Sequence, residues 1–262
     1  MPLQLAMLLF REAPTLAEVQ VQAALSSGWP ELATPTDFGV QDNTLSFRLG
    51  EADVVIGLMP APIPWVDLEG PCSTSYLWPN ALTEAKEHTI HAIVTVMGEL
   101  PPVQLSTLLT QVCAAVMTAL PQAIGVFWNN AVMVVPKGLF CDFATSILPK
   151  GPPIPVWVDF RVGWSESGKT SAGFTTGLAA LGLMELETRD ATEPPSELRQ
   201  RFESIAQYLL DNGPVIGDGN TVGNSATEQI RVTYSPSYFG AKGQVMRLTY
   251  ERNQQNKSWW RR

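Results

Sequence analysis

The sequence predicts an α+β protein, built from repeated β-α-β-β units that form mixed, mainly antiparallel sheets with helices packed on one face. Three observations support this fold class. Apolar residues make up 45% of the 262 residues, which is enough for a substantial core. Short apolar or β-branched runs alternate with longer, mostly proline-led segments of helical spacing. A pair of strand-like runs follows each helical segment, which favours antiparallel pairing.

The first unit lies at the N-terminal end of the chain. Leu3–Phe10 is a continuous apolar run and predicts a buried strand. A helix is expected over residues 14–27, where apolar residues recur at helical spacing before a glycine. Two further strands, at 44–49 and 53–58, complete the unit.

The same order of elements then returns twice. The second unit comprises a strand, a helix and a hairpin with Asn129-Asn130 as a two-residue turn: 90–97, 104–119, 123–128 and 132–135. A third, looser unit is expected from a strand, a helix and two strands: 183–188, 196–210, 230–234 and 245–250. Between these units we expect a short helix and another hairpin: 137–148, then 155–162 with 170–175.

Domain boundaries follow from this order. Residues 1–148 are expected to hold two β-α-β-β-like units, 149–250 the third unit with its hairpin, and 251–262 a flexible polar tail. The proline-rich segment Pro149–Pro155 is the best linker candidate, although one continuous domain is also compatible with the sequence.

Charge and composition exclude several classes of function. The formal net charge is -8 and the pI is about 4.8, so phosphate backbones would repel the protein and nucleic acid is not an expected partner. No apolar run reaches the roughly 18 residues of a membrane span, and the N-terminus lacks the basic start of a signal peptide. Three widely spaced cysteines imply no disulfide framework and fit a reducing cytoplasm.

The clearest motif is GWSESGKT, Gly163–Thr170, which matches the phosphate-binding loop pattern letter for letter. Such a loop needs a helix that starts at the lysine, so that amides point at the phosphate. The glycine- and threonine-rich residues after Lys169 instead favour a returning strand, which predicts a hairpin turn at 165–168. The second glycine cluster, Gly217–Gly223, is likewise expected to be an ordered turn.

Metal and acid–base sites are weakly indicated. His88 and His91 lie at the start of a predicted strand, so they are expected at the surface or at a helix end, and no third histidine or cysteine pair completes a zinc site. Glu185 and Glu187 alternate along a strand and are expected on its exposed face. The sequence therefore predicts no metal, no cofactor and no catalytic residue.

The stretch PWVDLEGPCSTSYLWPN, residues 64–80, shows no regular period and is expected to be a loop. Cys72 would need a histidine base nearby to act as a nucleophile, and neighbouring carboxylates would raise its pKa. Tryptophans in loops and hairpin tips are more typical of binding surfaces. The predicted partner-binding residues are therefore Trp65, Asp67, Glu69, Tyr76, Trp78, Trp128 and Asn129.

Several blocks of sequence together resemble a known family: WVDLEGPCSTSYLWP, PVWVDFRV, FTTGLAALGLMELE, DGNTVG and SPSYFGAKGQVMRL. The chain is similar to a mostly bacterial, uncharacterised family of unknown function, which has no established catalytic residues. Some relatives are associated with secreted antibacterial toxins, so the resemblance implies a role in immunity to a toxin.

The expected function is therefore a non-catalytic, cytoplasmic protein that binds another protein. Its most specific form is an immunity protein that neutralises a secreted toxin, such as a basic nuclease effector of type VI secretion, because an acidic surface would favour capture of a basic partner. Two alternatives remain open: a hydrolase or transferase that uses the Cys72 loop or the GKT loop, and a housekeeping oligomeric scaffold.

Overall fold

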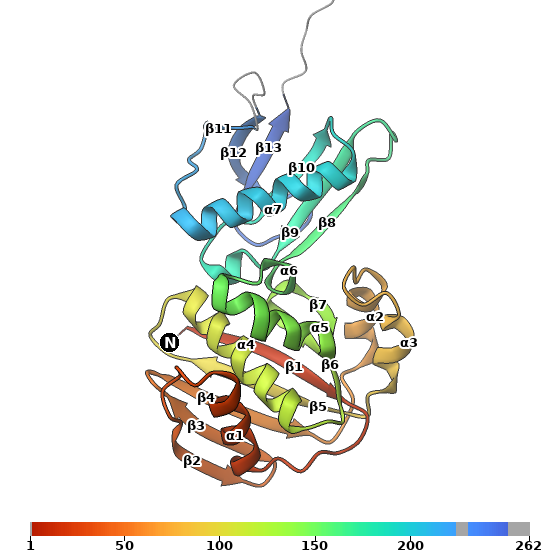
Figure 1. Cartoon of the computed structure of the whole chain (residues 1–262). Coiled ribbons are helices and arrows are strands. Elements are labelled where there is room, and N and C mark those ends of the chain that lie inside the picture. Colours follow the sequence, from red (N-terminus) through yellow and green to blue (C-terminus); the bar gives the residue numbers. More distant parts are fainter. Residues whose placement is uncertain (1, 224–229, 251–262) are drawn as a thin grey trace, which may run out of the picture. The chain divides into compact units, whose positions relative to one another are not determined.

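The computed structural model describes residues 2–223 and 230–250 (Figure 1). The chain forms two compact units: unit 1 contains Met1–Asp159 and Gly177–Gly182, and unit 2 contains Phe160–Thr176 and Leu183–Arg262. The linker candidate Pro149–Pro155 lies inside unit 1. Each unit is built around its own β-sheet.

The sheet of unit 1 has seven strands among the described residues, in the order β2-β3-β4-β5-β1-β6-β7, and all neighbours pair antiparallel. The central strands β1 and β5 are long apolar runs, as predicted; the side chains on one face are buried and most of those on the other face are partly buried. The strands are β1 (Leu3–Phe10), β2 (Thr36–Gln41), β3 (Thr44–Leu49), β4 (Ala52–Met59), β5 (Ile90–Met97), β6 (Ala123–Trp128) and β7 (Met133–Pro136).

Helical segments pack on both faces of this sheet. The long helix α4 (Pro102–Ala119) contacts β1, β5 and α1 (Glu18–Gly28). Leu9 packs instead with residues of α2 (Trp65–Ser73) and α3 (Ala81–Glu84), so these two helices cover the other face near β1. The unit also contains α5 (Lys137–Asp142), α6 (Ile154–Trp157) and the short turns η1 (Ala85–Glu87), η2 (Asn129–Ala131), η3 (Phe143–Ile147), η4 (Leu148–Lys150) and η5 (Ala179–Leu181).

Unit 2 is a six-stranded sheet with one long helix, in the part of the chain that the structure describes. The strand order is β11-β12-β13-β10-β9-β8, and only β10 and β13 pair parallel among the neighbours for which a register is defined. Helix α7 (Pro195–Asn212) buries Leu198, Phe202 and Leu209. The strands are β8 (Asp159–Trp164), β9 (Ser171–Thr176), β10 (Leu186–Ala191), β11 (Thr221–Val222), β12 (Ile230–Pro236) and β13 (Gln244–Tyr250).

The predicted α+β class with mainly antiparallel sheets is confirmed, although helices pack on both faces of the sheet in unit 1 and not on one face. The order of elements repeats, but the strand positions do not. β5 and β6 both flank β1 antiparallel, so they run parallel to each other and α4 connects them. β1 and β3 lie three positions apart and run antiparallel. A repeated order of elements therefore does not produce equivalent places in the sheet.

Three local predictions differ from the structure. Strand β2 at the edge of the sheet was not expected: its residues are mostly exposed, and Asp37 within it and Asp42 just after it adopt positive φ. The β6–β7 connection is the short turn η2 followed by left-handed Val132, and is longer than the predicted two-residue turn. By length and composition α4 is the one described helix that could cross a membrane, but 61% of it is buried within the protein.

Candidate functional site

The stretch 64–80 forms a helix at its start, and the prediction of an irregular loop there is wrong. Pro64 precedes α2, and Leu68, Pro71 and Cys72 fall on one buried side of the helix. The three- and four-residue spacing of these residues was the signal for a helix. Gly70 and Pro71 obscured that signal because both residues disfavour helix interiors.

Cys72 belongs to the core of unit 1. It packs with Leu9, Leu68 and Trp78 in an apolar cluster, and only 3% of the residue is exposed. Burial raises the pKa of the Cys72 thiol to about 11, although nearby Lys86 opposes the shift. The thiol is therefore protonated at neutral pH, and the surroundings work against the nucleophilic role considered from the sequence.

Two of the predicted partner-binding residues lie in the core. Trp78 is 4% exposed, and its Nε1–H donates to Glu84 at 2.6 Å. Trp128 is 1% exposed and packs against Phe140 with ring centroids 5.9 Å apart. Both tryptophans were expected at loop or hairpin tips, but the sheet and helices of unit 1 enclose them. Neither ring is accessible to a partner.

The other predicted contact residues reach the surface to different degrees. Asp67, Glu69 and Asn129 are exposed, and Tyr76 is 73% exposed. Trp65 is half-buried, with the Lys86 ammonium 4.4 Å from the centre of its ring. Its neighbour Val66, which the sequence analysis did not single out, is 83% exposed. We call the exposed residues of this segment, Val66, Asp67, Glu69 and Tyr76, the α2 surface.

The two histidines are buried and fix a loop, so the predicted surface position is wrong, whereas His88 lies at the end of the short helix η1, as the helix-end alternative predicted. His88 is 5% exposed, and its Nε2 accepts a hydrogen bond of 2.8 Å from the Ile63 amide. Its Nδ1 must therefore carry the proton and donates to the Ala85 carbonyl. His91 is 9% exposed, and its Nδ1 donates to the carbonyl of Ala61. Burial lowers the pKa of His88. The hydrogen bonds of the two rings hold residues 61–63 in place.

The GKT motif forms the hairpin turn that its context predicted. The backbone amide of Ser165 donates to the Thr170 carbonyl at 2.8 Å, and Gly168 adopts a φ of 65° in the turn. The chain continues from Lys169 into strand β9 and not into a helix. No set of helical amides is therefore aimed at a phosphate here, which disfavours the nucleotide-binding alternative. The predicted turn at Gly217–Gly223 is also ordered, with Asp218 accepting from the Tyr234 amide at 2.9 Å.

The open face of the sheet in unit 2, opposite α7, carries a row of paired side chains. Gly173 approaches Phe202 of α7, so alternation places its neighbour Phe174 on the other face. Phe174 pairs with Glu187, and Glu187 pairs with Arg247, across three strands. Arg247 donates to Glu187 Oε1 from Nη2 at 2.9 Å and from Nε at 3.1 Å.

Glu185 and Glu187 are therefore not the solvated pair that strand alternation predicted. Glu187 is 1% exposed and Glu185 is 8% exposed. Ser237 and the Tyr238 amide donate to Glu187, and Thr175 donates to Glu185 at 2.7 Å. Glu187 also pairs with Arg247, so its burial does not leave an unpaired charge.

A cleft of about 840 Å³ lies beside this row. Its lining combines exposed aromatic rings, an arginine pair, two carboxylates and several hydroxyl groups. Among these residues are Trp164, Ser165, Glu166, Thr170, Arg189, Asp190, Tyr238, Phe239, Arg247 and Tyr250.

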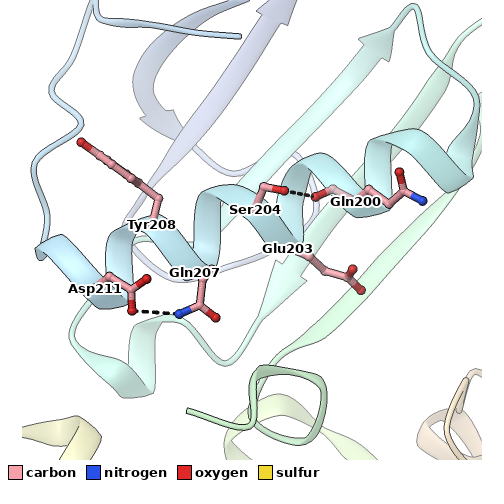
Figure 2. Close-up of a pocket in the computed structure, with 6 residues that line it drawn as sticks. All are labelled: Gln200, Glu203, Ser204, Gln207, Tyr208 and Asp211. Carbon is pink, nitrogen blue, oxygen red and sulfur yellow. Dashed lines mark hydrogen bonds between the residues drawn. The ribbon is translucent and has the colours of Figure 1, made fainter. Parts of the chain in front are cut away.

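The outer side of α7 forms a second, much shallower surface (Figure 2). Its side chains project from one side of the helix and are bonded along it: Gln207 donates to Asp211 at 2.8 Å and Ser204 to the Gln200 carbonyl at 2.8 Å. Tyr208 is 50% exposed. These groups do not converge on a common point, so this surface is suited to control substitutions. Among the described residues no group of three or more potential metal ligands occurs.

Comparison with known proteins shows that part of the chain is similar to an uncharacterised domain. Residues 174–249 match the sequence model of a family described as Domain of unknown function (DUF4261). The match covers less than a third of the chain, and most of it falls in unit 2, including α7, Glu187 and Arg247. No curated protein and no solved structure matches the chain significantly.

Proposed function

We propose that this chain is a non-catalytic protein that binds another protein through the α2 surface. Val66 and Tyr76, 83% and 73% exposed, lie in the same segment as the exposed carboxylates Asp67 and Glu69, and this observation carries the proposal. An apolar or aromatic anchor beside acidic groups fits a partner with a basic recognition surface. The net charge of -8 acts in the same direction.

The most specific form of the proposal is a cytoplasmic immunity protein for a secreted antibacterial toxin with a basic nuclease domain. The resemblance of the sequence to relatives associated with such toxins supports this form. Electrostatic attraction would speed the capture of a basic toxin and would weaken as salt rises.

The experiment begins with the products of neighbouring genes, which are co-expressed with the full chain and tested for co-purification and for rescue from toxicity. Binding of the recovered partner is then measured at low and high salt for two variants, Tyr76→Ala and the double variant Asp67→Lys/Glu69→Lys. We expect Tyr76→Ala to weaken binding about tenfold or more, as for an interface anchor. The charge reversal should mainly lower the association rate.

Tyr208→Ala on α7 is the matched control, because it also removes an exposed tyrosine from a helical region. If both α2-surface variants bind as tightly as this control, the assignment of the surface is wrong. If no neighbouring gene product binds or is neutralised, the immunity role is wrong. Light scattering of the purified chain tests the scaffold alternative, which expects a stable homo-oligomer.

The enzymatic alternative makes an opposite prediction for Cys72. Since its pKa is about 11, compared with 9.0 for an ordinary cysteine, its thiolate fraction at mildly alkaline pH is about 100-fold smaller than that of a free thiol. We expect iodoacetamide to label Cys72 at least that much more slowly in the native protein than in urea. Rapid native labelling, read by mass spectrometry, would favour a reactive nucleophile.

A further inference from the structure

The cleft of unit 2 has an aromatic rim supplied by two connections of the sheet. Trp164 at the end of β8 is 60% exposed, and Tyr238 and Phe239 between β12 and β13 are 56% and 39% exposed. Phe239 stacks on Phe174 with ring centroids 4.8 Å apart. Three large rings at the edge of one cleft leave apolar surface that the described residues do not cover.

Buried contacts hold this rim in place. The Tyr238 amide donates to Glu187 at 3.0 Å, and Arg247 lies 3.6 Å from the centre of the Tyr238 ring. Arg189 lies over the same ring at 4.8 Å. Because Glu187 is almost fully buried and also accepts from Ser237, the ring is oriented before any ligand arrives. Such pre-organisation reduces the entropy that binding costs.

The charges of the cleft favour a ligand that is both aromatic and basic. The charge of Arg247 is offset by Glu187, whereas the exposed carboxylates Glu166 and Asp190 make no ion pair among the residues that the structure describes. A tryptophan could stack on the rim, and an arginine could pair with either carboxylate. Arg189 also lines the cleft, so the cleft has no large negative net charge. Its preference for a basic ligand depends instead on where each charged group lies.

The chain itself carries a sequence of this chemistry next to the cleft. Tyr250 lines the cleft and donates to Glu193 at 2.6 Å. It is followed directly by Glu251–Arg262, which includes SWWRR at Ser258–Arg262 and lies outside the described residues. The seven residues between Tyr250 and Ser258 can span up to about 25 Å, so the connection is long enough to reach the rim.

We propose that the cleft of unit 2 is a peptide-binding site for a tryptophan- and arginine-containing segment, and that Ser258–Arg262 of the same chain is its ligand. A covalent link of this length gives an effective concentration in the millimolar range, so even a weak peptide site would be occupied. Occupancy would close the site to other peptides of the same chemistry. This site is separate from the α2 surface and does not depend on the function proposed for it.

Hydrogen exchange on the full chain tests the proposal. We compare the wild type with Trp259→Ala/Trp260→Ala and expect amides in 164–170 and 237–240 to exchange several-fold faster in the variant. Tyr208→Ala on α7 is the control for loss of an exposed aromatic and should leave these segments unchanged. A synthetic peptide, ERNQQNKSWWRR, added to the double variant should restore protection. Its alanine version, ERNQQNKSAARR, should not.

Glu166→Lys/Asp190→Lys in the double-alanine background should weaken binding of the synthetic peptide at least tenfold. Equal exchange in wild type and variant, together with no peptide binding, would overturn the proposal. Protection that grows with protein concentration would assign the cleft to the segment of a second copy, which overturns the intramolecular assignment. Binding of the α2-surface partner is measured separately, so either proposal can fail alone.

Discussion

The two units treat buried polar groups in different ways. Several buried side chains of unit 1 are paired as neutral groups: His88 and His91 bond to the main chain, and Trp157 donates to Thr110 at 2.8 Å. Unit 2 buries charges in pairs, with Glu187 bound to Arg247 and Glu193 to Arg201. A buried carboxylate needs such a partner, because burial of an unpaired charge is costly.

The two units also differ in which side chains they expose to a ligand. In unit 1 the apolar face of α2 packs in the core, and only the outer side chains of the helix are exposed. In unit 2 the ion pair of Glu187 and Arg247 supports an exposed aromatic ring, Tyr238, in the connection between β12 and β13. Substitutions in each unit can test whether unit 2 depends on charge pairing and unit 1 on close packing and neutral hydrogen bonds.

The largest effect is expected from Glu187→Ala. The change leaves Arg247 without its carboxylate and removes the acceptor of Ser237 and the Tyr238 amide. Breaking a buried pair from one side costs about 3–5 kcal/mol, which urea unfolding would show as a lower stability. Glu203→Ala is the control in the same unit, because Glu203 is a more exposed partner of Arg199 and should cost below about 1 kcal/mol. Similar losses in both variants would refute the dependence on buried charge.

A smaller effect is expected from Gly125→Ala in β6. A Cβ at this position would lie 2.5 Å from the Trp78 ring and 2.7 Å from the Val135 carbonyl, so side chains and backbone must shift. Overpacking of this kind costs about 1–3 kcal/mol of unfolding free energy. Gly138→Ala in α5 is the control, since no atom lies within 4 Å of the position that its Cβ would take, and it should be neutral or slightly stabilising. A destabilisation of Gly138→Ala equal to that of Gly125→Ala would contradict the packing argument.

The sequence predicts the elements whose signal is local. Leu3–Phe10 and Ile90–Met97 are continuous apolar runs, and both form central strands within the predicted bounds. The hairpin after Gly163 also follows from local turn chemistry, because glycine and threonine residues disfavour a helix there.

The parts that the sequence does not predict depend on distant partners. Glu187 is read as exposed because its partner Arg247 is 60 residues away, and strand alternation carries no information on that pairing. Trp78 is read as an exposed contact residue because Gly125, which makes room for its ring, lies on the distant strand β6. The cleft of unit 2 was missed for the same reason, since it joins the β8–β9 turn to the segment around Tyr238.

The smallest effect is the pH dependence of unit 1 through His88. Burial lowers the pKa of His88 in the folded protein below the ordinary 6.5. As pH falls through that value, the unfolded chain takes up a proton that the folded ring resists, so the free energy of unfolding falls. The contribution of neutral His88 to the free energy of unfolding is complete above the ordinary pKa and is lost progressively as the pH falls below it. Urea midpoints measured at about pH 7.5 and about pH 5.5 should show this loss in the wild type.

His88→Gln separates this ring from every other titrating group. A glutamine oxygen can accept the hydrogen bond from the Ile63 amide in place of Nε2, but the amide does not take up a proton in this pH range. We expect the variant to lose less stability than the wild type between the two pH values, because it lacks the imidazole whose protonation the folded protein resists. An identical loss in the two proteins would mean that protonation of His88 does not limit unit 1, and that its neutral hydrogen bonds are not the pH-sensitive part of the core.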